Sequence, residues 1–174
     1  LNNSEKTEDY GLFYDSPILL QNLSLDSTYF FKLKANNELG SSKYTEVLGT
    51  TPSINTPKIL VVNGFDRING TNNSFDYIKQ HGQAIKNSGY TFDATSNEAV
   101  INGTLNLNDY LIVDWILGEE GSSSYSFDAN EQTKVTSFLK NGGRLFVSGS
   151  EIGYDLVEKG NQYDKDFYYK ILKA

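Results

Sequence analysis

Polar and charged side chains directly follow three apolar segments of the chain, and their types and spacing suit chemistry at a shared site. The set consists of Asp66, Arg67, Glu119, Glu120, Ser150 and Glu151. If the three segments are parallel strands, these side chains converge at one edge of a sheet, where ligands of open α/β sheets bind. All six are candidate ligand-binding residues, and the catalytic candidates among them are Glu119, Glu120, Ser150 and Glu151.

The chemistry open to these residues depends on how the carboxyl groups are spaced. Two carboxyls can hydrolyse a glycosidic bond when they lie about 5–10 Å apart and one has a raised pKa. Three interpretations therefore stay open. In the first, Arg67 balances the charge of the acids, and the serines and glycines only shape the turns. In the second, the edge of the sheet binds carbohydrate or peptide. In the third, the carboxylates hydrolyse a substrate. Hydrolysis would place Glu151 and either Glu119 or Glu120 in one open cleft.

Other kinds of reactive site find little support in the sequence. The chain has no cysteine, which removes disulfides, thiolate metal sites and cysteine nucleophiles. Its single histidine, His81, falls in an expected helix on the flank of the sheet, so a structural role is predicted for it. Gly64 is not followed by the G-x-G-x-x-G pattern of dinucleotide sites. We predict no cofactor and no metal site.

Composition indicates a packed chain that binds no nucleic acid and does not span a membrane. Hydrophobic residues make up 38% of the 174 residues, which is enough for a core. The net charge is −7, and no basic patch is present that could release counterions from a nucleic acid. No apolar run approaches the ~20 residues that a membrane-spanning helix needs.

Apolar runs alternate with helical periodicity from residue 58 onward, which predicts an α/β domain with a parallel sheet and right-handed crossovers. The expected strands cover 58–63, 90–93, 110–117 and 144–149, in the spatial order 2-1-3-4 with helices on both faces. One helix is expected over 74–88 and another over 164–173. Asp128 and Glu131 have the spacing of a capping box for a helix that ends at 141–143.

The amino-terminal part has the alternation typical of β-strands. Strands are expected at 18–23, 29–35 and 43–50, with a turn at 36–40. Two prolines within 52–57 mark a linker. Residues 23–29 place a Leu six positions before a Tyr, which resembles the tyrosine corner of fibronectin type III domains. The resemblance implies that residues 1–51 are the last part of such an all-β sandwich; the alternative is an unrelated β-hairpin.

Residues 148–153 have the order strand, glycine turn and helix that forms a nucleophile elbow. They resemble the G-x-C-x-G elbow of class I glutamine amidotransferases, which implies a flavodoxin-like, doubly wound domain over 58–174, truncated at its carboxyl end. The central position is Glu151 where that family has cysteine, so amide transfer is not implied. Amides of the following helix are expected to hold the Glu151 carboxylate, with Arg67 as its ionic partner.

Four segments, 64–67, 90–100, 113–120 and 148–155, are together similar to a module of large secreted Bacteroidetes proteins labelled xanthan lyase or N-acetylmuramoyl-L-alanine amidase. The resemblance implies a secreted or cell-surface location, with other domains of the same protein as partners. The intact protein is accordingly expected to extend beyond Leu1 and Ala174. We expect a non-catalytic accessory or interaction module with a glycan or peptidoglycan ligand. The alternative is a hydrolase of polysaccharide or peptidoglycan that acts through the acidic cluster.

Overall fold

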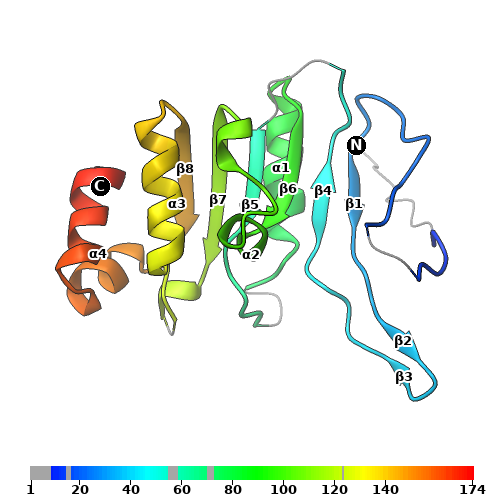
Figure 1. The fold of residues 1–174 in the computed structure, drawn as a ribbon, viewed down its shortest axis with the longest axis horizontal. Helices are drawn as coiled ribbons and strands as arrows, with labels where there is room; N and C mark the ends of the chain where they lie inside the picture. Colours follow the sequence, from blue (N-terminus) through cyan, green and yellow to red (C-terminus); the bar gives the residue numbers. More distant parts are fainter. Residues whose placement is uncertain (1–8, 15–16, 55–58, 70–72, 123) are drawn as a thin grey trace.

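A six-stranded sheet with helices on both faces forms the centre of the molecule (Figure 1). The computed structural model describes residues 9–14, 17–54, 59–69, 73–122 and 124–174. The strand order is β1-β4-β6-β5-β7-β8. These strands are β1 (Tyr29–Phe31), β4 (Leu48–Thr50), β5 (Ile59–Asn63), β6 (Phe92–Ser96), β7 (Ile112–Gly118) and β8 (Arg144–Gly149).

The four strands after residue 58 confirm the predicted parallel arrangement. The spatial order β6-β5-β7-β8 is the expected order 2-1-3-4, and all three strand pairs are parallel. The central strand β5 is buried on both faces because successive side chains point to opposite sides of the sheet. Leu60, Val61 and Val62 are accordingly fully buried. The apolar run that predicted a central strand is therefore explained by two packed layers.

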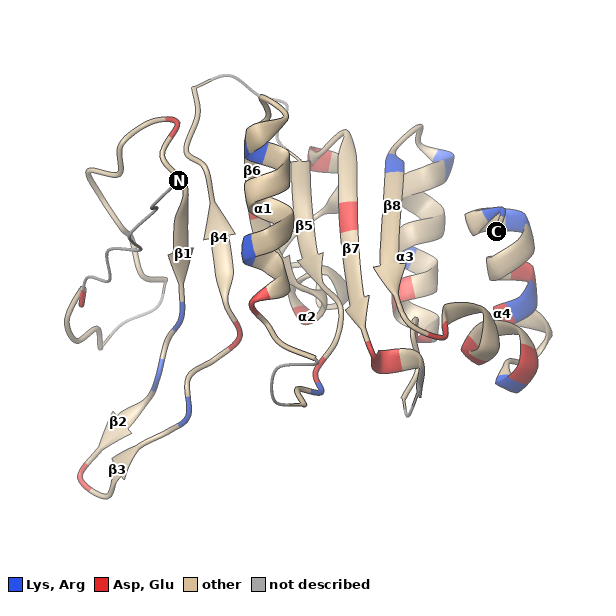
Figure 2. Ribbon diagram, turned by 180° about the vertical axis from the view of Figure 1, so that it is seen from behind, with Lys and Arg blue, Asp and Glu red and all other residues tan. Residues whose placement is uncertain are grey.

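Helix α1 (Tyr77–Asn87) covers one face, and α2 (Asn97–Ile101) and α3 (Ala129–Lys140) lie on the other face (Figures 1 and 2). Ile78 and Gly82 are the buried positions of α1, as its periodicity predicts. Gly82 lets α1 approach the sheet closely, since a Cβ there would lie 2.3 Å from the Phe92 ring. Gly89, with φ of +83°, follows the helix and reverses the chain.

The segment after β8 is helical but not regularly α-helical. Residues Tyr154–Lys159 form a π-helical stretch, and α4 (Gln162–Asp166) continues into a second one, Phe167–Leu172. The helix predicted at 164–173 therefore begins two residues earlier and widens after one turn. Phe167 anchors it by an edge-on contact with Phe127, with ring centroids 5.3 Å apart.

The amino-terminal hairpin pairs with the β6 edge of the α/β sheet. Strands β1 and β4 pair antiparallel, and β4 pairs antiparallel with β6 through Thr50 and Asp93. The Thr50 hydroxyl donates to the Asp93 carboxylate at 2.6 Å, and Phe30 packs on Phe92 with ring centroids 6.2 Å apart. The described part of residues 1–51 thus contributes β1 and β4 to the six-stranded sheet.

Some local predictions in this hairpin are confirmed and others are wrong. The Ser24 amide donates to the Tyr29 hydroxyl at 2.9 Å, within the segment 23–29 that the sequence singled out. The turn is closed by the small strands β2 (Asn36–Asn37) and β3 (Gly40–Ser41). The strands expected at 29–35 and 43–50 shorten to β1 and β4. Residues 18–23 form no strand, because they pair with no neighbouring strand in the described residues.

Two further expectations concern the linker and the membrane. Residues 52–54 carry no regular structure, and 55–57 of the expected linker lie outside the described residues. In the described part of the chain, no helix is long and apolar enough to cross a bilayer.

Substitution of Gly82 by Ala tests the packing of α1 on the sheet. Helix propensity alone favours Ala by about 1 kcal/mol. We expect the clash with Phe92 to reverse the sign and to destabilise the fold by about 1–3 kcal/mol. Chemical denaturation measures the change, and Gln83→Ala at the exposed neighbouring position is the control. A Gly82→Ala protein that is more stable than wild type would contradict the close approach.

Candidate functional site

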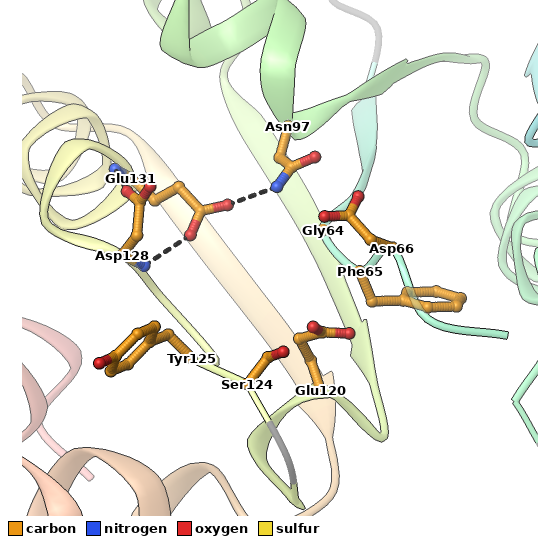
Figure 3. Close-up of a pocket in the computed structure, with 9 residues that line it drawn as sticks. All are labelled: Gly64, Phe65, Asp66, Asn97, Glu120, Ser124, Tyr125, Asp128 and Glu131. Atoms are coloured by element: carbon orange, nitrogen blue, oxygen red, sulfur yellow. Dashed lines mark hydrogen bonds between the residues drawn. The ribbon is translucent and has the colours of Figure 1, made fainter.

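A pocket of about 180 Å³ lies beyond the carboxyl ends of β5 and β7 (Figure 3). It is lined by Gly64, Phe65, Asp66, Asn97, Glu120, Ser124, Tyr125, Asp128 and Glu131. The strand order changes direction between β5 and β7, since β6 lies on one side of β5 and the later strands lie on the other. Open α/β sheets bind ligands at such a point. The position of the pocket is therefore that of a ligand site.

The loops after β5 and β7 are tied together by two side chains. Asn73, fully buried, donates to the Arg67 carbonyl at 2.5 Å and accepts from the Glu119 amide at 3.2 Å. The Arg67 guanidinium donates to the Glu119 carbonyl at 2.6 Å. Gly118 turns the chain at the end of β7 with φ of +50°. These contacts place Asp66 and Glu120 on two sides of the same pocket.

Glu131 joins two helices at the pocket wall. The capping box predicted for α3 is confirmed, because the Glu131 amide donates to Asp128 at 2.8 Å and the Asp128 amide donates back at 2.7 Å. The second oxygen of Glu131 accepts from Asn97 at 2.8 Å. Burial raises the pKa of Glu131 to about 7, although the bonds from Asn97 and Asp128 oppose this shift. Glu131 therefore changes its protonation near neutral pH.

Like charges crowd the opposite side of the pocket. Partial burial raises the pKa of Asp66, and the neighbouring Glu98, which shares a hydrogen bond with it, and Glu120 raise it further. Burial likewise raises the pKa of Glu46, against the lowering effect of a hydrogen bond from the Asn63 side chain. Carboxyl groups at this edge of the sheet therefore keep their protons to a higher pH than they would in water.

Glu120 is the most buried of the acids near the β7 end of the pocket. Its side chain is 7% exposed, and its Oε2 atom has no hydrogen-bond partner among the described residues. Figure 3 shows the carboxyl group pointing into the pocket. A buried carboxylate oxygen without a partner is costly unless a ligand, an ion or a proton satisfies it.

The structure brings only part of the predicted site together. Asp66 and Glu120 line the pocket, whereas Arg67 and Glu119 link the two loops beside it. The remaining candidates, Ser150 and Glu151, are exposed and do not line the pocket.

The turn after β8 has the strain expected of an elbow, because Glu151 has φ of +59°, which side chains rarely adopt. The expected partner of Glu151 was Arg67. The Arg67 guanidinium instead bonds to the Glu119 carbonyl. Glu151 therefore does not close the pocket as an internal anion.

The segment after the elbow supports the β7 loop from below. Asp155, 3% exposed, accepts from the Ser126 amide at 2.6 Å and forms an ion pair with Lys159 at 3.0 Å. Lys159 also donates to the Gly121 carbonyl at 3.1 Å. The elbow thus contributes to the site through Asp155, which fixes the loop that carries Glu120.

Several pocket residues were not predicted from the sequence, chiefly Asn97, Tyr125, Asp128 and Glu131. A signal for two of them was present, because the helix that follows β7 must begin at the carboxyl edge of the sheet. Asp128 and Glu131 start that helix, and we assigned them only a capping role. A residue that caps a helix next to a strand end also faces the ligand edge.

His81 lies in α1, on the face opposite to α2 and α3. Its Nδ1 atom lies 2.7 Å from Asp114 Oδ2, in the middle of β7. Asp114 is 8% exposed, so the pair links α1 to the sheet. This placement agrees with the predicted structural role.

Within the described ranges, no group of three His, Asp or Glu side chains is placed to hold a metal ion.

Stability should fall as the pH rises through the range in which Glu131 titrates. Its pKa is raised on folding, so the folded chain binds more protons than the unfolded chain between about 4.5 and 7. We expect a higher melting temperature at pH 5 than at pH 8, with a contribution from Glu131 of up to about 3 kcal/mol. Thermal unfolding of wild type and Glu131→Gln measures it.

The substituted protein should show a smaller difference between the two pH values, because Gln keeps the shape and does not titrate. Glu158→Gln, at an exposed position, should retain the wild-type difference. Equal pH dependence in all three proteins would contradict the assignment to Glu131.

Comparison of the chain with protein-family models, with curated proteins and with solved structures gives no match. Function is therefore inferred from the pocket and its charges.

Proposed function

We propose that the chain is a non-catalytic binding module of a secreted multidomain protein, and that its acidic pocket binds one small polar group of a glycan or cell-wall ligand. The observation that carries the proposal is the pocket between β5 and β7, with four carboxyl side chains in its lining. Whole drug-sized ligands occupy about 300–1,000 Å³. A volume of about 180 Å³ suits a single terminal group of a larger ligand.

The absence of catalysis is inferred from where the reactive residues lie. The elbow residue Glu151 is exposed and outside the pocket lining. His81 bonds to Asp114 in the middle of β7, away from the strand ends. Nucleophilic catalysis needs a nucleophile and a base within hydrogen-bond reach of each other. These two residues do not meet that need.

One observation favours a second candidate, a glycoside hydrolase that uses the pocket acids. Glu131 has a pKa of about 7, so part of it can donate a proton at neutral pH, and Asp66 lines the same pocket. Such hydrolysis requires one carboxyl group that donates a proton and a second carboxylate about 5–10 Å away. In this alternative Glu131, and not Glu151, supplies the acid.

A binding screen followed by product analysis separates the two candidates. The full chain is tested against soluble glycans and peptidoglycan fragments, and bound ligands are examined for cleavage. We expect binding without products, and about tenfold weaker binding by Glu120→Gln, since a charged hydrogen bond is worth about 1.5–3 kcal/mol. Glu158→Gln is the matched control away from the pocket. Cleavage that disappears in Glu131→Gln would overturn the non-catalytic function and establish the hydrolase.

A further inference from the structure

The pocket gathers negative charge without a balancing cation in its lining. Asp66, Glu120, Asp128 and Glu131 are all acidic, and the nine lining residues include no Lys, Arg or His. Figure 2 shows acidic segments at the arrowhead end of β7 and in the helices beside it. Such a pocket favours a positively charged group and disfavours an anion of the same size.

We propose that the pocket binds a primary ammonium group, with Glu120 as its main ionic partner. This rests on the proposed binding function and names the chemistry of the group that is bound. Glu120 lines the pocket with its carboxyl group pointing into it, and its buried Oε2 atom lacks a partner among the described residues. An ammonium group provides the N–H donor and the charge that this oxygen needs.

The surroundings of Glu120 favour an ammonium group over a metal ion. Calcium takes six to eight oxygen ligands, and magnesium requires a near-octahedral set. No three acidic or histidine side chains are placed for such a set in the part of the chain that the structure describes. An ammonium group carries only three donors, which two or three separate oxygens can satisfy.

The other residues that line the pocket can contact the carbon atoms next to the ammonium group. Phe65 and Tyr125 contribute aromatic surface, and Ser124 and Asn97 add polar groups at the pocket wall. A cation near an aromatic face is also attracted to it. The ammonium group can therefore be carried by an amino sugar or by the side chain of a lysine in a peptide, which are two sources of one chemistry.

Titrations with paired probes test the proposal and identify the source. Glucosamine is compared with N-acetylglucosamine, and Nα-acetyl-lysine with Nα,Nε-diacetyl-lysine, with NMR of the full chain at pH 7 as the readout. Each acetylated probe keeps the body of its partner and lacks the ammonium charge. We expect at least one amine to bind at least about tenfold more tightly than its acetylated form. The pair that shows the difference identifies the source as amino sugar or lysine.

Variants link the binding to the pocket. Glu120→Gln should weaken amine binding by about 10- to 100-fold, whereas Glu158→Gln should leave it within about twofold. Asp66→Asn, at an exposed position in the lining, provides a second test if Glu120→Gln does not fold. Its expected effect is a loss of at least about threefold, because its charge is more hydrated.

Three results would overturn the proposal: equal binding of amines and acetylated probes, amine binding unchanged in both pocket variants, or displacement of the amine by millimolar calcium or magnesium chloride. If neutral glycans bind the pocket and the amines do not, the proposed binding function stands and only the proposal of an ammonium ligand is rejected. If no glycan, peptidoglycan fragment or amine binds, both the binding function and the ammonium proposal are rejected.

Discussion

Burial of β5 on both faces determines where the chemistry of this protein lies. Leu60, Val61 and Val62 pack against opposite layers, and that packing is only available to a strand in the centre of a covered sheet. Because β6, β5, β7 and β8 are parallel, the loops after all four strands meet at one edge. Asn73 and Arg67 then join the loops after β5 and β7. The pocket is a consequence of this arrangement.

The same arrangement brings acidic side chains close together although their negative charges repel one another. Asp66 lies near Glu98 and Glu120, and the charges of Asp128 and Asp66 contribute to the raised pKa of Glu131. A fold gains nothing from collecting like charges in a small volume, and stability is commonly lowered at functional sites for the sake of binding. Burial and the neighbouring acids raise the pKa values of Asp66 and Glu131, and Glu120 Oε2 has no partner among the described residues, so a positive charge in the pocket would stabilise all three carboxyl groups. The proposed ammonium group would provide it.

Local patterns in the sequence were sufficient for the parallel sheet, for α1 and for the capping box of α3. Each depends on residues close together in the chain, such as Asp128 and Glu131. The attachment of the hairpin could not be predicted, because β4 meets β6 through the single pair Thr50 and Asp93. The elbow predicted at 148–153 agrees with the positive φ of Glu151, but no local pattern indicates that this residue is exposed and outside the pocket lining. Asp66 and Glu120 were therefore predicted at the edge where the pocket lies, together with Ser150 and Glu151, which do not line it.

In the proposed function, Glu120 is kept for a ligand and not for the fold. Thermal unfolding of wild type and Glu120→Gln without any ligand tests it most directly. Gln preserves the shape of the side chain and removes the charge of a carboxyl group whose buried Oε2 atom has no partner among the described residues. We expect a melting temperature above that of wild type, equivalent to about 1 kcal/mol. A melting temperature below that of wild type would show that the carboxylate stabilises the fold, and would contradict the claim.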